Sequence, residues 1–253
     1  MINLDKDAAG ESFVSHLIEL RDRLVRAILG LVVIFVILLI WPGAPRIYDF
    51  LAQPMMAALP VGAKMIATGV IAPFLVPMKV TLLLAFLLSL PWTFYQAWAF
   101  IAPGLYEHEK RLVWPLVISS SFLFLAGVAF SYFLVFGQVF KFIYSIAPQS
   151  ISVAPDIENY LDFVTSMCLA FGACFEVPVV QVVLVRMGIV GVDKLRAIRP
   201  YAVVGAFIIS AIVTPPDVVS QLSLAIPMCL LFELGLWLAP LFVRATQAPE
   251  ESA

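Results

Sequence analysis

Six long apolar runs constrain the fold of this chain more than any other feature of its sequence. They lie at residues 25–41, 74–98, 114–136, 160–185, 201–213 and 222–243. A helix needs about 20 predominantly apolar residues to cross the hydrocarbon core of a bilayer. Because 62% of the residues are hydrophobic and only 13% are charged, a soluble core could not bury this much apolar surface. The sequence therefore predicts an all-α integral membrane protein with six transmembrane helices, organised as a single polytopic membrane domain over residues 1–253.

The positions of the basic residues predict the orientation of these spans. An even number of spans places both termini on one side, and the side richer in Lys and Arg is normally cytoplasmic. Of the 15 basic residues, 11 fall on the side of the termini and 4 on the other. The 11 are Lys6, Arg21, Arg23, Arg26, Lys110, Arg111, Arg186, Lys194, Arg196, Arg199 and Arg244, and the 4 are Arg46, Lys64, Lys79 and Lys141. Both termini, including the tail at 244–253, are therefore expected in the cytoplasm.

Two connections on the other side have unusual properties. Residues 201–213 reach only about 20 Å as a helix, whereas the hydrocarbon core is about 30 Å thick. The connector TPPDVVSQ (214–221) should therefore lie inside the far leaflet, where its polar groups need protein or water partners. The longest connection, the predicted outer loop at 42–73, contains RIYDFLAQPMMAAL. Its apolar residues recur at helical spacing, which predicts a short helix on the outer surface.

Polar side chains inside or beside the apolar runs mark candidate sites. Glu176 lies deep in the fourth run, two residues before Pro178, which should disturb the helix backbone there. A carboxylate inside a membrane costs a few kcal/mol and by default faces a cavity or a partner; a protonated, hydrogen-bonded core residue is the alternative. Asp217 and Gln221 follow the fifth run, where they either contact a partner or form the turn that the two prolines begin.

The amino-terminal segment SFVSHLIELRDRLVRAI is predicted to be a helix that enters the membrane. Glu19 and Arg23 are four residues apart, as are Asp22 and Arg26. This spacing predicts two ion pairs along the helix surface, each worth a few tenths of a kcal/mol.

The segment FIAPGLYEHEKR (100–111) carries two acids on the predicted cytoplasmic side. If the chain continues as helix after the Pro-Gly pair, Glu107 has Arg111 four residues further on, whereas Glu109 has Val113. Glu109 is therefore predicted to be available to a ligand, and solvation of a loop is its alternative role.

Several classes of protein are excluded by the sequence. There is no GxxxxGK[ST], HExxH or GxSxG motif, so we expect no enzyme and no nucleotide-driven machine. The two histidines are isolated and the three cysteines lie in apolar runs without a CxxC, so we expect neither a metal nor another cofactor. With a net charge of −2 and no long basic run, nucleic acid is not an expected partner. Any work must therefore draw on a membrane gradient or on a partner.

Five segments, in this order, closely resemble the TatC family, the multispanning core components of the twin-arginine protein translocase. They are HLIELRDRL (16–24), PWTFYQAWAFIAPGLYEHEKR (91–111), FEVPV (175–179), RPY (199–201) and TPPDVVSQ (214–221). The resemblance implies a glove-shaped, multi-pass protein of the bacterial inner membrane with short fifth and sixth spans. It also implies a receptor for the twin-arginine signal peptides of folded cargo. The proton-motive force would drive transport of that cargo. TatA-like and TatB-like single-span partners and a homo-oligomeric receptor complex follow from the same resemblance.

The resemblance also implies roles for individual residues. Glu109 matches the family's signal-binding acid, with Phe100 and Glu19 as its neighbours in that role. Glu176 matches the intramembrane acidic position, and a further pair, Asp217 and Gln221, matches the polar outer end that meets partner helices. One departure is Gly69, where the family pattern predicts an acid, and this puts in doubt any role of the first outer loop that depends on that charge.

A proton-coupled small-solute transporter that uses Glu176 as its titrating group is the alternative function. The chain shows no repeat between its halves, and its predicted binding loop lies at the membrane surface rather than at the midplane. Both features favour the translocase.

Overall fold

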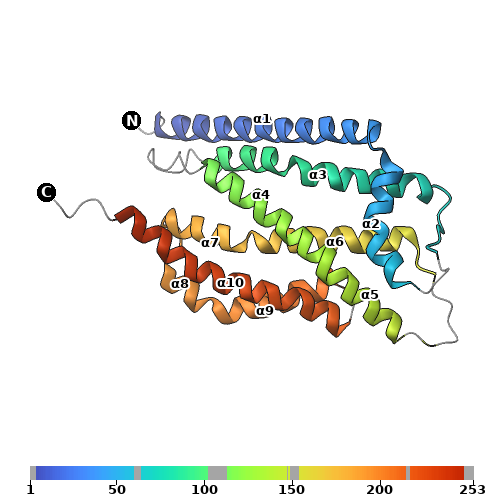
Figure 1. Ribbon diagram of the computed structural model, residues 1–253. Helices are drawn as coiled ribbons and strands as arrows, with labels where there is room; N and C mark the ends of the chain where they lie inside the picture. The colour runs from blue at the N-terminus through green and yellow to red at the C-terminus, as the bar shows by residue number, and fades with distance from the viewer. Residues whose placement is uncertain are drawn as a thin grey trace. The chain divides into compact units, whose positions relative to one another are not determined.

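The structure is a computed structural model of the 253-residue chain and describes residues 4–59, 64–101, 113–146, 148, 154–214 and 217–247. In these ranges the regular structure is helical, apart from one isolated parallel bridge between Ile66 and Asp156. The elements in chain order are α1 (Leu4–Ile40), α2 (Ala44–Ala58), α3 (Ala72–Ile101), α4 (Val113–Phe130), the π-helical turn η3 (Ser131–Val135), α5 (Phe136–Ser145), α6 (Ile157–Phe175), α7 (Val177–Arg186), α8 (Val192–Ala197), α9 (Arg199–Val213) and α10 (Val218–Gln247) (Figure 1).

Five stretches of helix are long and apolar enough to cross a membrane. They are Val14–Ile40, Ala72–Ile101, Val113–Ser145, Ile157–Arg186 and Val218–Leu241. The all-α membrane class predicted from the sequence is thereby confirmed. The fifth apolar run is indeed short, because α9 has only 15 residues. The prediction of a short sixth span is wrong, because α10 is 30 residues long. Pro227 and Pro240 lie inside this helix and do not end it.

Two apolar runs deviate from a regular α-helix. In the fourth run, α6 ends at Glu176 and α7 begins with Pro178 in its first turn, as the position of that proline predicts. In the third run, the π-turn η3 separates α4 from α5. Such a turn contains one extra residue, which rotates the side chains that follow it around the helix axis, and π-turns are frequent at functional sites.

The chain divides into two compact units. Unit 1 comprises Met1–Gly43 and Thr81–Ser121, and unit 2 comprises Ala44–Val80 and Phe122–Ala253. In unit 1, helix α1 is largely exposed: of its residues from 14 to 40, only Leu38 is buried. An apolar helix surface of this kind is normally covered by lipid or by another protein.

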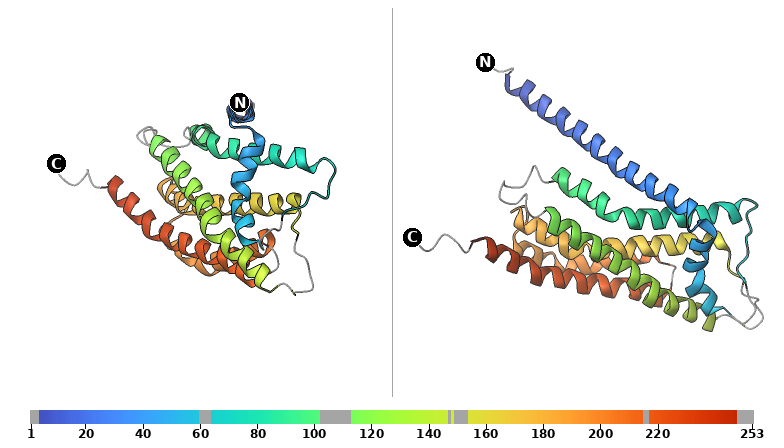
Figure 2. Two further views of the ribbon diagram at one scale, coloured as in Figure 1. Left: turned by 45° about the vertical axis from the view of Figure 1, so that its right-hand side comes forward. Right: turned by 45° about the horizontal axis from the view of Figure 1, so that its top comes forward.

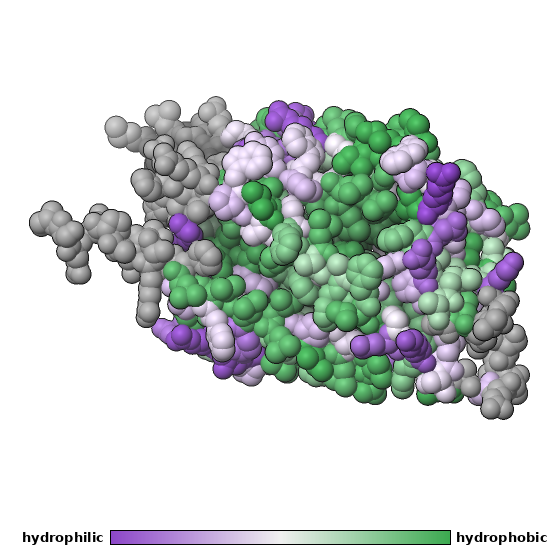
Figure 3. Space-filling model, viewed as in Figure 1, coloured by the Kyte–Doolittle hydropathy of each residue, from purple (hydrophilic) through white to green (hydrophobic). Residues whose placement is uncertain are grey.

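Unit 2 has a continuous hydrophobic core around α6. Its fully buried side chains include Phe136 and Val139 of α5, and Val164, Met167 and Phe171 of α6. A second cluster joins α7, α8 and α10. Helices α7 and α10 lie side by side in both views of Figure 2. On the face drawn in Figure 3, hydrophilic side chains gather over α8, whose sequence is VDKLRA, whereas apolar side chains cover the middle of α10.

Helix α2 is tied to this core by two tyrosine hydroxyls. Pro54 lies inside α2 and has no N–H, so the carbonyl of Phe50 cannot receive the usual helical hydrogen bond. Tyr132 of η3 donates to that carbonyl at 2.6 Å. Tyr160 of α6, which is almost fully buried, donates to the next carbonyl, that of Leu51, at 2.7 Å. The helix predicted within 42–73 is therefore present and anchored to the core by hydrogen bonds.

Candidate functional site

Two of the three predicted signal-binding residues lie in unit 1 and are described. The ring of Phe100, at the end of α3, stacks on the imidazole of His16 in α1, with ring centroids 4.4 Å apart and an interplanar angle of 21°. Glu19 lies on α1 one turn further along the helix than His16. The structure thus brings an aromatic stack and an acid together at one end of unit 1. Glu109, like Glu107, lies outside the described residues.

Glu19 is held by the ion pair that the sequence predicts. Its carboxylate Oε1 lies 2.6 Å from Nη2 of Arg23 and accepts a hydrogen bond from Nε at 2.8 Å. Both side chains are partly buried, at 33% and 22% exposure, so solvent screens this pair less than it screens a surface pair. The second predicted pair is wrong, because Asp22 accepts from its neighbour Arg21 at 2.8 and 3.0 Å, and not from Arg26. Adjacent side chains can meet when both turn toward solvent, and Arg21 is 70% exposed.

A tryptophan fixes α1 against α3 within unit 1. The indole Nε1 of Trp92 donates to the backbone carbonyl of Arg26 at 2.9 Å. Gly30 makes this approach possible, because a Cβ at that position would lie 2.5 Å from Cδ1 of Trp92 and 2.7 Å from Nε1. This contact determines where α1 presents Glu19 and His16 to the end of α3.

We expect Gly30→Ala to destabilise the protein although alanine is the better helix former. Overpacking of this kind costs about 1–3 kcal/mol, against a propensity gain of up to about 1 kcal/mol. Gly137→Ala is the matched control, since nothing lies within 4 Å of a Cβ built there. Thermal unfolding of both variants in detergent measures the difference. Equal melting temperatures would show that the Trp92 contact does not constrain α1.

Glu176 occupies the junction between α6 and α7. Its N–H donates to Ala173 O at 3.1 Å, and its own carbonyl accepts from Val180 N at 3.0 Å. One carboxylate oxygen, Oε1, is buried. Glu176 lies ten positions before the end of the candidate span at Arg186, or about 15 Å along the helix, which is half the thickness of a hydrocarbon core. This place in the span agrees with the intramembrane position that the sequence predicts for Glu176.

Asp217 and Gln221 lie at the turn between α9 and α10, in unit 2. Asp217 Oδ1 accepts from Ser220 N at 2.7 Å and caps α10, and Gln221 Nε2 donates to Phe207 O at 3.3 Å. Both side chains thus have structural roles. The other carboxylate oxygen of Asp217 is buried, as are the hydroxyls of Ser210 and Ser220, and none of the three has a hydrogen-bond partner in the described part of the chain. Among the described residues this hydrogen-bonding capacity is unused, and such capacity is costly wherever it meets lipid.

A bidentate ion pair closes the opposite end of this hairpin. Arg199, the first residue of α9, binds the carboxylate of Glu233 in α10, with Nε–Oε1 at 2.6 Å and Nη2–Oε2 at 2.7 Å. The planar guanidinium fits a carboxylate in this way, and a lysine would not reproduce the geometry. The RPY segment thus links α9 to α10.

Gly69, the departure from the family pattern, has an acid beside it. A Cβ on Gly69 would lie 3.3 Å from Oε2 of Glu158, near the start of α6. A carboxylate therefore lies next to this position, supplied by a distant part of the sequence.

Asp156 joins the same connection to α6. Its Oδ1 caps α6 by accepting from Glu158 N and Asn159 N, and its Oδ2 accepts from the N–H and the hydroxyl of Thr68, at 3.0 and 2.7 Å. These hydrogen bonds, first of all the one from the Thr68 hydroxyl, lower the pKa of Asp156.

The lowered pKa predicts acid sensitivity at this junction. A carboxylate whose pKa is depressed in the folded state contributes stability above its unfolded pKa, and that contribution is lost as pH falls through the folded value. Asp156 has an unfolded pKa near 4, so its contribution should be complete at neutral pH and decline below about pH 4. Asp156→Ala should lower the melting temperature at pH 7 and reduce the loss seen on acidification. An unchanged acid profile would exclude this role.

Sequence reasoning did not identify the Trp92–Arg26, Tyr132–Phe50 and Glu158–Gly69 contacts. For the Tyr132–Phe50 contact a signal was available, because Pro54 inside the helical pattern of α2 leaves the Phe50 carbonyl without its helical donor. Among the described residues, no cluster of His, Cys, Asp and Glu could hold a metal ion.

These elements define a class: a multi-pass helical membrane protein with acidic and amide side chains at the ends and in the middle of its apolar helices. Residues 15–227 match the family described as Sec-independent protein translocase protein (TatC). The chain belongs to the TatC family. It is therefore a non-enzymatic component of a Tat protein translocase in the bacterial inner membrane.

Individual relatives agree with this assignment. The TatC protein of Haemophilus influenzae is 49% identical over 239 residues, which cover 94% of this chain and 91% of that protein. The TatC protein of Escherichia coli K12 is 47% identical over 241 residues, which cover 95% and 93%. A crystal structure described as the twin arginine translocase receptor TatC superposes with a TM-score of 0.78 at 35% identity, and the match covers 90% of this chain and all of that one.

Proposed function

We propose that this chain recognises twin-arginine signal peptides at the cytoplasmic face of the membrane and so begins the export of folded proteins, which the proton-motive force drives. The observation that carries this proposal is the stack of His16 on Phe100, one helical turn from the partly buried Glu19. Planar guanidinium groups bind aromatic faces and pair with carboxylates in a bidentate manner. The family assignment and the solved receptor structure support the same conclusion.

The Glu19–Arg23 pair gives the proposed site a way to exchange partners. An incoming signal arginine competes with Arg23 for the same carboxylate, so no buried acid is left unpaired before binding. Glu109 supplies the second carboxylate, since its sequence spacing leaves it without a basic residue four positions further on.

The proposal is tested by crosslinking. A photoreactive residue at position 100 should crosslink to a twin-arginine signal peptide and much less to a twin-lysine peptide, because lysine cannot form the bidentate pair. Efficient labelling by both peptides would contradict guanidinium recognition. Uptake of small solutes into vesicles, abolished by Glu176→Gln, would instead support the alternative transporter, which the family assignment does not favour.

The proposed topology has six spans in one polytopic domain with both termini in the cytoplasm. The short α9 would then end inside the far leaflet, next to the Asp217 and Gln221 turn. We use a reporter that is active only in the cytoplasm. It should be active when fused to either terminus and inactive when inserted at position 218. The reverse pattern would overturn the orientation.

TatA-like and TatB-like single-span proteins and further copies of this chain are the proposed partners. The buried hydrogen-bonding groups of Asp217, Ser210 and Ser220 support a contact site on the α9–α10 hairpin. The exposed apolar surface of α1 is a second candidate.

A further inference from the structure

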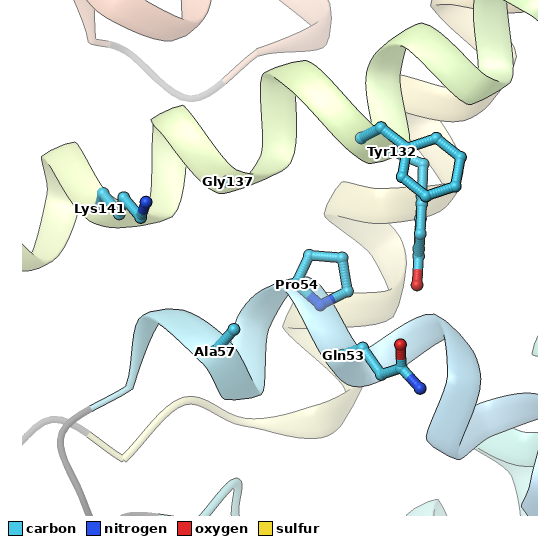
Figure 4. Close-up of a pocket in the computed structure, with 7 residues that line it drawn as sticks. Gln53, Pro54, Ala57, Tyr132, Gly137 and Lys141 are labelled. Carbon is cyan, nitrogen blue, oxygen red and sulfur yellow. The ribbon is translucent and has the colours of Figure 1, made fainter.

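Unit 2 carries a groove between α2 and the third membrane run. Its volume is about 320 Å³. It is lined by Gln53, Pro54, Ala57, Tyr132, Phe133, Gly137 and Lys141. Figure 4 shows residues of α2 on one side of the groove, facing Gly137 and Lys141 of α5 on the other.

Small side chains and fixed hydrogen bonds keep this groove open. A Cβ on Gly137 would meet nothing within 4 Å, and opposite it α2 presents the small side chains of Ala57 and Pro54 beside Gln53. The hydrogen bond from Tyr132 to the Phe50 carbonyl holds the two walls together. The groove is therefore bounded by two helices that this hydrogen bond links.

The groove has a polar end and an apolar end. Lys141 lies four residues before the end of the span Val113–Ser145, at the depth of the lipid headgroups, and the amide of Gln53 is also exposed. Phe133, which is 73% exposed, lies eight residues earlier along the same run, or about 12 Å deeper in the membrane. A ligand that follows the groove therefore needs an anionic end at Lys141 and an apolar end at Phe133.

We propose that this groove binds one anionic phospholipid. Its phosphate pairs with Lys141 and accepts from the Gln53 amide, while an acyl chain lies over Gly137 toward Phe133. The volume is at the lower end of the range for small-molecule sites and suits a chain segment better than a partner helix. With the orientation proposed above, the lipid belongs to the outer leaflet. That leaflet assignment rests on the proposed function, whereas the binding itself does not.

The experiment compares retention of phosphatidylglycerol and phosphatidylcholine by the purified full-length protein, measured by native mass spectrometry from mixed detergent micelles. Gly137→Leu places a larger side chain in the groove, starting from a Cβ that meets nothing within 4 Å, and should reduce retention of either lipid at least tenfold. Lys141→Gln should reduce phosphatidylglycerol retention roughly fivefold, since a basic residue near an anionic lipid surface is worth about 1 kcal/mol. It should reduce phosphatidylcholine retention much less, because the choline cation of that lipid offsets the charge of its phosphate. Arg46→Gln, which removes an exposed cation from α2, is the control and should change neither.

Equal retention in wild type and Gly137→Leu would overturn the proposal, as would an equal effect of Lys141→Gln and Arg46→Gln. Loss of a co-purifying protein partner in Gly137→Leu, with lipid retention intact, would assign the groove to that partner instead. Crosslinking of the signal peptide at position 100 should be unaffected in all three variants. Failure of signal recognition and failure of lipid binding are therefore separate outcomes.

Discussion

Replacing Glu109 with alanine should weaken binding of a twin-arginine peptide by on the order of 10- to 100-fold. A hydrogen bond to a charged group is worth roughly 1.5–3 kcal/mol, and its loss leaves a guanidinium unpaired at a partly dehydrated surface. Glu109→Gln should also weaken binding, because an amide retains one acceptor but cannot form the bidentate ionic pair. Titration of a labelled signal peptide against the purified protein measures both effects.

Glu107→Ala is the matched control, because the spacing predicts an ion pair between Glu107 and Arg111 if this segment continues as helix. Its effect on binding should be much smaller. A general acidic patch would make the two alanine variants alike, and unchanged binding in Glu109→Ala would remove this residue from the proposed site.

Replacing Glu176 with alanine should reduce transport of a folded Tat substrate by roughly 10-fold or more. The carboxyl group lies at the α6–α7 junction with one oxygen buried, and the sequence predicts that this junction lies near mid-membrane. We propose that it forms a hydrogen bond with a signal peptide or partner helix that enters after docking. Removal of one partner of a buried hydrogen bond costs about 1–3 kcal/mol. Glu176→Gln preserves hydrogen bonding and should keep much of the activity, measured as export into inverted vesicles.

Asp162→Ala is the control for this position. Asp162 lies on the same helix but is exposed, so its loss should change export little. Equal inactivation by Glu176→Gln and Glu176→Ala would refute the hydrogen-bond role and indicate that the charge itself is required. Signal binding should survive both changes, since the proposed role follows docking.

Features that depend on local spacing were predictable from the sequence alone. The apolar runs, the short fifth run and the break before Pro178 follow from run length and from the missing N–H of proline. The Glu19–Arg23 pair follows from the helical repeat, which puts residues four apart on one face. In each case the partner is covalently close, so few geometries are possible.

Only the tertiary structure decided which distant groups meet. Trp92 binds the carbonyl of Arg26, 66 residues away, and Tyr132 binds that of Phe50, 82 residues away. Glu158 likewise lies beside Gly69. Even the local pair between Asp22 and Arg26 failed, because Arg21 reaches the same carboxylate. The physical reason is that every backbone carbonyl is a candidate acceptor for a distant donor, and the packing of helices selects among them.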